Sequence, residues 1–139
     1  MSVDSTGMAA RLGIKPGMVV QELGWDEDAD EDLRDAIIEV SGGEMVDEDT
    51  DEVADVVLLW WREDDGDLFD ALTDAITSLA DEGVVWLLVP KSGRPGHVEP
   101  GDVTEVAPTA GLSQTTSVSA AKDWSGIRLV TPKAARTRR

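Results

Sequence analysis

Three basic side chains, Lys91, Arg94 and His97, lie close together in the glycine-containing segment PKSGRPGHVEPGD. The segment directly follows the apolar run 84–89, and open α/β sheets bind their ligands beyond the carboxyl ends of strands. Its glycines let the backbone approach a bound group closely, and all three cationic side chains donate charge-assisted hydrogen bonds to anions. The segment is therefore a candidate site for a small anionic ligand such as a nucleotide. A flexible loop whose cations only balance nearby carboxylates has the same pattern.

Trp61 and Arg62 extend this candidate site, because they end the neighbouring apolar run 56–61. No catalytic set accompanies them. His97 is the single histidine, cysteine is absent, and no serine or carboxylate can be assigned to that histidine from the sequence. Nucleophilic catalysis needs a nucleophile and a base within hydrogen-bonding reach of each other. We therefore expect no catalytic residues, and the loop stays a candidate for ligand binding only.

Two acidic runs, WDEDADED and VDEDTDEVAD, carry aspartates at alternate positions, as calcium-binding loops do. An EF-hand loop also needs glycine at its sixth position and glutamate at its twelfth. The first run offers Glu31 and Ile37 at these positions, and the second offers Glu52 and Leu58. We expect no metal site, and a solvated acidic face that stabilises a helix N-terminus explains the first run.

The charge is segregated along the chain, which has 139 residues and a formal net charge of -17. Residues 22–82 hold 24 acids and two bases, whereas residues 83–139 hold eight bases and four acids. Binding to a phosphate backbone needs clustered cations, so nucleic acid is not an expected partner. A strongly acidic surface suits a basic protein partner instead.

Length and composition predict one domain at 6–130, between a flexible N-terminus at 1–5 and a basic flexible tail at 131–139. No apolar run approaches the roughly 18 residues of a membrane span, and the N-terminus does not resemble a signal peptide. We therefore expect a cytoplasmic protein that does not engage a membrane.

Strand-like and helix-like patterns alternate along the chain. The runs 56–61 and 84–89 are apolar at every position, which is typical of strands covered on both faces. Predicted strands are 18–23, 44–46, 56–61, 84–89, 113–120 and 125–130, and predicted helices are 28–40, 67–80 and 99–110, the last interrupted by Pro108. This order predicts a three-layer, Rossmann-like α/β sandwich with five or six mostly parallel strands and an antiparallel C-terminal hairpin.

The segment LGIKPGMVVQELG, residues 12–24, resembles the entry to the core of class I S-adenosylmethionine methyltransferases. The segments TGMAARLGIKPG, VVLLWW, VVWLLVPKSG and DWSGIRLV together resemble a small uncharacterised family of unknown function that is widespread in actinobacteria. The resemblance covers nearly the whole chain. It implies a trimmed methyltransferase-like Rossmann core and supplies no activity.

The cofactor loop of such methyltransferases has an acidic residue followed by glycines at alternate positions. Glu22 and Gly24 match its opening, but Trp25, Asp26 and two further acids stand where the remaining glycines would be. Bulk and negative charge there obstruct the cofactor and repel its carboxylate. We expect a degenerate loop and no bound cofactor, with a divergent methyltransferase as the alternative.

Five tryptophans accompany a single phenylalanine and no tyrosine. We expect Trp86 and one of the adjacent pair Trp60 and Trp61 in the core, because neighbouring strand residues point to opposite faces. Trp25 and Trp124 lie in polar, turn-like stretches, where partial exposure would let an indole anchor a protein partner. The sequence thus favours a non-catalytic acidic binding or regulatory module.

Overall fold

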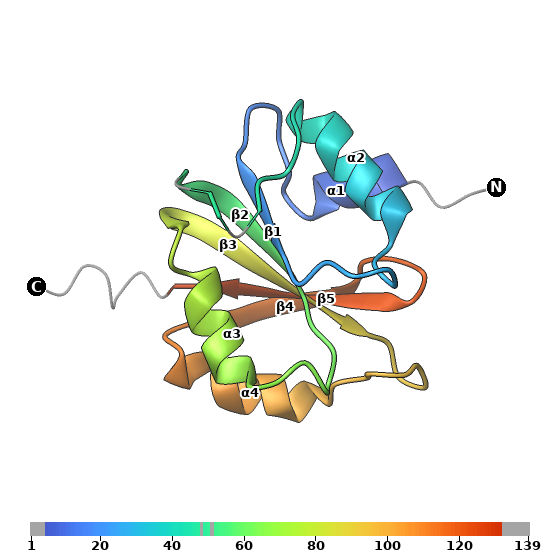
Figure 1. The fold of residues 1–139 in the computed structure, drawn as a ribbon, viewed down its shortest axis with the longest axis vertical. Coiled ribbons are helices and arrows are strands. Elements are labelled where there is room, and N and C mark those ends of the chain that lie inside the picture. Colours follow the sequence, from blue (N-terminus) through green and yellow to red (C-terminus); the bar gives the residue numbers. More distant parts are fainter. Residues whose placement is uncertain (1–4, 48, 51, 132–139) are drawn as a thin grey trace, which may run out of the picture.

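The structure is a computed structural model that describes residues 5–47, 49–50 and 52–131. Its centre is a five-stranded sheet with the strand order β1-β2-β3-β5-β4 (Figure 1). The strands are β1 (Val20–Leu23), β2 (Ala54–Trp60), β3 (Leu79–Pro90), β4 (Ser113–Ser119) and β5 (Trp124–Val130). The helices are α1 (Ser5–Arg11), α2 (Glu31–Ser41), α3 (Leu68–Ala75) and α4 (Pro100–Thr109). The predicted α/β architecture is confirmed.

Strands β1, β2 and β3 run parallel, whereas β5 pairs antiparallel with both β3 and β4. The predicted C-terminal hairpin is therefore present as β4 and β5. Leu23 at the end of β1 pairs with Leu59 near the end of β2. The carboxyl ends of these two strands consequently meet at the same edge of the sheet.

Helices cover both faces of the sheet, with α1 and α2 on one face and α3 and α4 on the other (Figure 1). Alternate residues of β2 serve the two layers, since Leu58 and Trp60 pack beneath α1 and α2 while Val57 and Leu59 pack beneath α3 and α4. Both layers exclude water, which explains why this strand is apolar at every position.

Helix α2 has clear sequence signals at both ends. Its N-cap is Asp30, whose side chain accepts a hydrogen bond from the backbone N–H of Leu33 at 2.9 Å. It ends at Gly42, which adopts a left-handed conformation and donates its N–H to the carbonyl oxygen of Ile38. The expected helix at 28–40 is thus present, and it begins three residues later because the cap is Asp30.

Helix α3 is shorter than predicted. The expected helix 67–80 ends at Ala75, and Leu79 and Ala80 belong to β3 instead. Leu79 pairs with Ala54 in the parallel ladder. Its spacing from the apolar residues of α3 fits a helix, yet it belongs to the sheet. The apolar spacing alone did not distinguish these two ways of burying a leucine.

Two further differences concern the N-terminal half. Helix α1 was not predicted, although its Ala9 is fully buried against the layer that α2 covers. The expected strand 44–46 is reduced to one parallel bridge between Val46 and Gln21. The sheet therefore ends beside β1 with a single bridged residue.

The predicted flexible termini mostly lie outside the described residues, which begin with Ser5 in α1 and end with Thr131 after β5. Among the described residues, no helix is long and apolar enough to cross a membrane.

Candidate functional site

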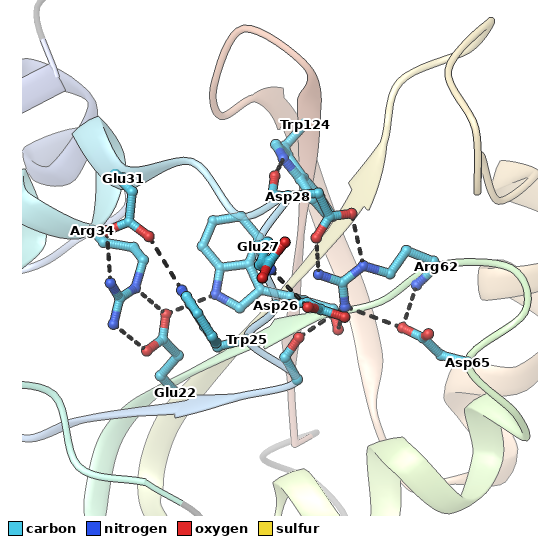
Figure 2. Close-up of polar contacts among 12 residues, drawn as sticks. Glu22, Trp25, Asp26, Glu27, Asp28, Glu31, Arg34, Arg62, Asp65 and Trp124 are labelled. Atoms are coloured by element: carbon cyan, nitrogen blue, oxygen red, sulfur yellow. Dashed lines mark hydrogen bonds and ion pairs between the residues drawn. The ribbon is translucent and has the colours of Figure 1, made fainter.

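Two acidic loops meet at the carboxyl edge of the sheet, residues 24–30 after β1 and residues 61–67 after β2 (Figure 2). Carboxylates and tryptophans from these loops and from neighbouring elements gather around Arg34 and Arg62, the only two bases in residues 22–82. We call this group of side chains the edge network. Its members are Glu22, Trp25, Asp28, Glu31, Arg34, Trp60, Arg62, Asp65 and Trp124.

Arg62 is the centre of one half of the edge network, and it is only 8% exposed. Its guanidinium donates to both carboxylate oxygens of Asp28, with Nη2–Oδ1 at 2.5 Å and Nε–Oδ2 at 3.0 Å. Its Nη1 donates to the carbonyl oxygen of Gly24 at 2.8 Å and to Asp65 at 3.2 Å. Arg62 belongs to the loop after β2, and its bidentate hydrogen bonds to Asp28 connect that loop to the loop after β1.

Arg34 on α2 is the centre of the other half. Its Nε and Nη2 donate to the two carboxylate oxygens of Glu22 at 2.6 and 2.8 Å, and its Nη1 donates to Glu31 at 2.8 Å. The indole Nε1 of Trp60 also donates to Glu22, at 2.9 Å. The acid that the methyltransferase resemblance places in the cofactor loop is therefore engaged by partners from its own chain.

Trp124 closes the edge network from the C-terminal hairpin. Its Nε1 donates to the backbone oxygen of Asp28 at 3.1 Å, and its ring meets Trp60 edge to face at a centroid distance of 4.8 Å. The Arg62 guanidinium lies 5.2 Å from the centroid of the same ring. Trp124 is 3% exposed, so the expected partial exposure is wrong. The polar, turn-like sequence around Trp124 suggested exposure, but its ring packs into the interior.

Trp25 does reach the surface, with 49% of the residue exposed. Its Nε1 donates to Glu31 at 3.2 Å, and Arg34 lies 5.7 Å from its ring centroid (Figure 2). The expected exposure of this indole is confirmed. Its role as a partner anchor stays a prediction.

Ion pairing shifts the pKa values of Asp28, Glu31 and Arg62. Hydrogen bonding from Arg62 lowers the pKa of Asp28 despite some desolvation, and hydrogen bonding from Arg34 and Trp25 lowers that of Glu31. Burial of Arg62 acts to lower its pKa, but hydrogen bonds to the two aspartates outweigh that effect and raise it. Both carboxylates therefore stay charged when their arginine partners are in place.

Gly24 lies at the position where the resemblance expects a cofactor to approach the backbone. It has a φ of 76°, and a Cβ there would overlap the carbonyl oxygen of Trp60. The missing side chain thus makes room for a neighbouring strand rather than for a ligand. With Asp26, Glu27 and Asp28 following, the loop as folded does not fit the S-adenosylmethionine site that the fold implies.

The loop with the predicted anion-binding residues packs beside Arg62. Glu63 donates its N–H to the carbonyl oxygen of Gly96 at 2.9 Å, and a Cβ on Gly96 would lie 3.0 Å from the Cβ of Arg62. The sequence placed this loop next to the end of β2, and the structure brings the two together. The donors of Arg62, however, are directed to protein acceptors.

Two of the three basic side chains of this loop have acceptors within the protein. Arg94 Nε lies 3.5 Å from Asp123 Oδ1, and His97 Nδ1 donates to the carbonyl oxygen of Pro90 at 2.9 Å. His97 Nε2 lies 3.7 Å from Glu99. Lys91 makes no ion pair with a described residue. Anion binding by this loop stays a prediction.

A small hollow of about 150 Å³ lies beside the same loop. Its charged lining consists of Arg94, Asp28 and Asp123, so two carboxylates face one guanidinium. Trp61 does not line this hollow, because its side chain is buried in the layer beneath α3 and α4. A ligand at the loop would therefore meet Lys91, Arg94 and His97 without the predicted indole.

Within the part of the chain that the structure describes, no three side chains of the histidine, cysteine, aspartate or glutamate types are placed to hold a metal ion. In the first run, Asp30 caps α2 and Asp28 binds Arg62.

Sequence reasoning missed the role of Arg34. The signal was present, since Arg34 and Arg62 are two isolated bases among 24 acids in residues 22–82. An isolated base in such a stretch is surrounded by carboxylates and is expected to be the centre of an ion-pair cluster.

Solved structures with a similar fold are S-adenosylmethionine-dependent methyltransferases and related proteins. The pyocyanin biosynthetic protein PhzM superposes with a TM-score of 0.66 at 14% identity, over 92% of this chain and 54% of that one. This chain thus spans about half the length of PhzM. A methyltransferase from Aquifex aeolicus superposes with a TM-score of 0.62 at 14% identity, over 91% of this chain and 88% of that one. At such identities the likeness shows a shared, trimmed methyltransferase-like fold.

Sequence relatives come from mycobacteria. Uncharacterised proteins of Mycobacterium bovis (strain ATCC BAA-935 / AF2122/97) and Mycobacterium tuberculosis (strain ATCC 25618 / H37Rv) are each 57% identical over 129 residues. The match covers 93% of this chain and 81% of each relative. A family model described as "Protein of unknown function (DUF3052)" matches residues 9–133. The chain therefore belongs to this family of unknown function, as the resemblance of its segments predicted.

Proposed function

We propose that this protein is a non-catalytic binding module, in which a methyltransferase-like frame is retained while its own side chains occupy the former cofactor edge. The observation that carries this proposal is the environment of Arg62. Its guanidinium fills the space between the loops after β1 and β2 and is bound by Asp28, Asp65 and the Gly24 carbonyl oxygen. A cofactor in that position would have to displace a buried cation whose three nitrogens all donate hydrogen bonds.

The cofactor-loop acid supports the same conclusion. Glu22 would have to exchange Arg34 and Trp60 for the cofactor, which costs one short bidentate ion pair and an indole hydrogen bond. Such charge-assisted pairs are stronger than neutral hydrogen bonds. The site is built to hold its own loops together.

The partner that we propose is a basic protein. Many of the acids outside the edge network are exposed, including Asp32, Asp35 and Glu39 along α2. A surface with one dominant sign of charge attracts an oppositely charged partner over distances near the Debye length of about 8 Å at physiological salt. The exposed Trp25 lies beside this surface and offers an apolar anchor.

Titration calorimetry with S-adenosylmethionine tests the first half of the proposal. We expect no saturable heat at millimolar cofactor. Micromolar binding would instead support the alternative, a divergent methyltransferase, which the likeness to the Aquifex aeolicus enzyme favours.

Affinity capture from the native host, followed by mass spectrometry, tests the second half. The recovered partner should be basic, and its association rate should fall as salt rises.

Two variants with the same change in net charge test which surface the partner contacts. Neutralising Asp32, Asp35 and Glu39 on α2 should slow association several-fold, whereas neutralising Glu99, Asp102 and Glu105 at α4 should change it little, since the second set lies in the basic half of the chain. Equal effects would argue against recognition by the acidic face.

A further inference from the structure

A cavity of about 380 Å³ lies beside α3, on the face of the sheet opposite to Glu22 and Trp60. Cavities of this size accommodate small ligands. Leu23 of β1, Leu59 of β2 and Ala71 of α3 supply an apolar lining. The polar lining comes from Gln21, Asp74, Thr77 and Ser78. No member of the edge network lines this cavity.

Gln21 is the unusual residue of the cavity wall, because it is a polar side chain only 3% exposed. Its Nε2 donates to the backbone oxygen of Asp47 at 3.1 Å. A carbonyl oxygen can only accept, so this contact fixes which end of the amide is nitrogen. The other end, Oε1, is buried and accepts no hydrogen bond from the described residues. Buried carbonyl oxygens are nearly always paired, so this atom calls for a donor.

Asp74 places a second acceptor on the cavity wall. It lies on α3 and is exposed, and its carboxylate makes no hydrogen bond or ion pair with a described residue. A carboxylate and an amide oxygen both accept hydrogen bonds, so they select a ligand that donates. The negative charge of Asp74 repels anions and favours a cation.

We propose that this cavity binds a protonated alkylamine or alkylguanidinium group. The cationic head donates to Asp74 and to Gln21 Oε1, while the hydrocarbon part lies on Leu23 and Leu59. Two sources share this chemistry, a free diamine and the side chain of an arginine or lysine on a partner protein. The inference does not depend on the proposed function, since the cavity and the edge network use different residues on different faces of the sheet.

Agmatine, which carries an ammonium and a guanidinium group on a four-carbon chain, is a suitable probe. Titrated into the isotopically labelled protein, it should shift the side-chain amide resonances of Gln21 and the backbone resonances of Leu23, Ala71 and Ser78 in a saturable way. Asp74→Asn should weaken the binding about tenfold, which corresponds to about 1.4 kcal/mol.

Asp70→Asn is the matched control, because Asp70 is an exposed acid on the same helix that does not line the cavity. It should change the affinity less than twofold. Equal weakening by both substitutions would show diffuse attraction to an acidic surface and would overturn the proposal. The absence of saturable shifts at Gln21 and its neighbours at millimolar agmatine would overturn it as well.

A second arm compares agmatine with the blocked tripeptide Ala-Arg-Ala. Tighter binding of agmatine assigns the cavity to a free amine, and tighter binding of the tripeptide assigns it to a partner's side chain. Either result upholds the cation-binding chemistry if Asp74→Asn weakens it. Calorimetry with S-adenosylmethionine, which tests the proposed function, is independent of both arms.

Discussion

The two faces of the sheet treat their polar groups differently around the same short strand. On the α1 and α2 face, Glu22 of β1 is bound by Arg34 and by the indole of Trp60. On the α3 face, the adjacent Gln21 lines a cavity, and its Oε1 accepts no hydrogen bond from the described residues. These two neighbouring residues of β1 therefore lie in different surroundings, because successive strand residues point to opposite faces of the sheet. Glu22 lies in the closed edge network, and Gln21 lines the cavity.

The difference between the two faces indicates that space for a ligand lies beside α3. A buried charge is tolerated when hydrogen bonds compensate its lost hydration, and all three nitrogens of the Arg62 guanidinium donate to acceptors within the chain. The edge network therefore acts as structure, joining two loops and the C-terminal hairpin. Gln21, which lines the cavity on the other face, keeps an acceptor that no described residue satisfies.

The largest effect should come from Gly24→Ala. The left-handed φ costs an alanine about 1–2 kcal/mol, and overlap with the Trp60 carbonyl oxygen adds to it, so we expect a loss of about 3 kcal/mol in unfolding free energy. Urea denaturation measures it. Gly93→Ala is the control, since Gly93 has a φ of 87° but nothing within 4 Å of a built Cβ. Equal losses at both glycines would mean that Gly24 is not held against β2.

Arg62→Ala should lower the unfolding free energy by about 2–3 kcal/mol, because it removes charge-assisted hydrogen bonds and leaves the Gly24 carbonyl oxygen without its guanidinium donor. Arg94→Ala, at an exposed residue of the neighbouring loop, should change it by no more than about 0.5 kcal/mol. Chemical denaturation of the two variants compares the loss of a buried arginine, Arg62, with the loss of an exposed one, Arg94. An Arg62 variant as stable as the Arg94 variant would remove the structural role of the edge network.

The Asp28–Arg62 pair should make stability depend on pH at the acidic end. The folded-state pKa of Asp28 lies below its ordinary value of 3.8, so the pair's contribution is complete above that value. It should disappear as the pH falls through the lower folded-state pKa. Melting temperatures of the wild type and Asp28→Asn, measured between about pH 6 and pH 2, should therefore converge only below that ordinary value. A constant difference throughout that range would contradict the pKa shift.

The smallest effect on stability should come from replacing Lys91 and Arg94 together with alanine. Neither side chain is buried, so the fold should persist. If the loop binds a phosphate-bearing ligand, nucleotide-dependent thermal stabilisation should be present in the wild type and lost in the double variant. Absence of stabilisation in the wild type, or its full retention in the double variant, would identify the loop as ordinary surface.

Most of the fold followed from local sequence patterns. The continuous apolar runs predicted β2 and β3, and Asp30 and Gly42 mark the ends of α2. The boundary between α3 and β3 was predicted wrongly, because Leu79 suits a helix stripe and a parallel strand equally well. Tertiary pairing with Ala54 decides between them, and local spacing does not contain that information.

The candidate site was only partly predictable. The resemblance identified Glu22 and Gly24, but it gave no partners for them. The inward position of Trp124 depends on contacts with Asp28 and Trp60, which are distant in sequence. Pairings between distant segments are set by the assembled sheet, so neither the edge network nor the unpaired oxygen of Gln21 has a local signature.

The carboxyl edge of the sheet is closed by side chains of the chain itself. The most direct test follows the indole resonances of Trp60 and Trp124 in a heteronuclear spectrum while S-adenosylmethionine is added, because both Nε1 groups donate within the edge network. Neither resonance should move at millimolar cofactor. Saturable shifts of both indoles would show that the cofactor enters this edge and that the edge network does not exclude it.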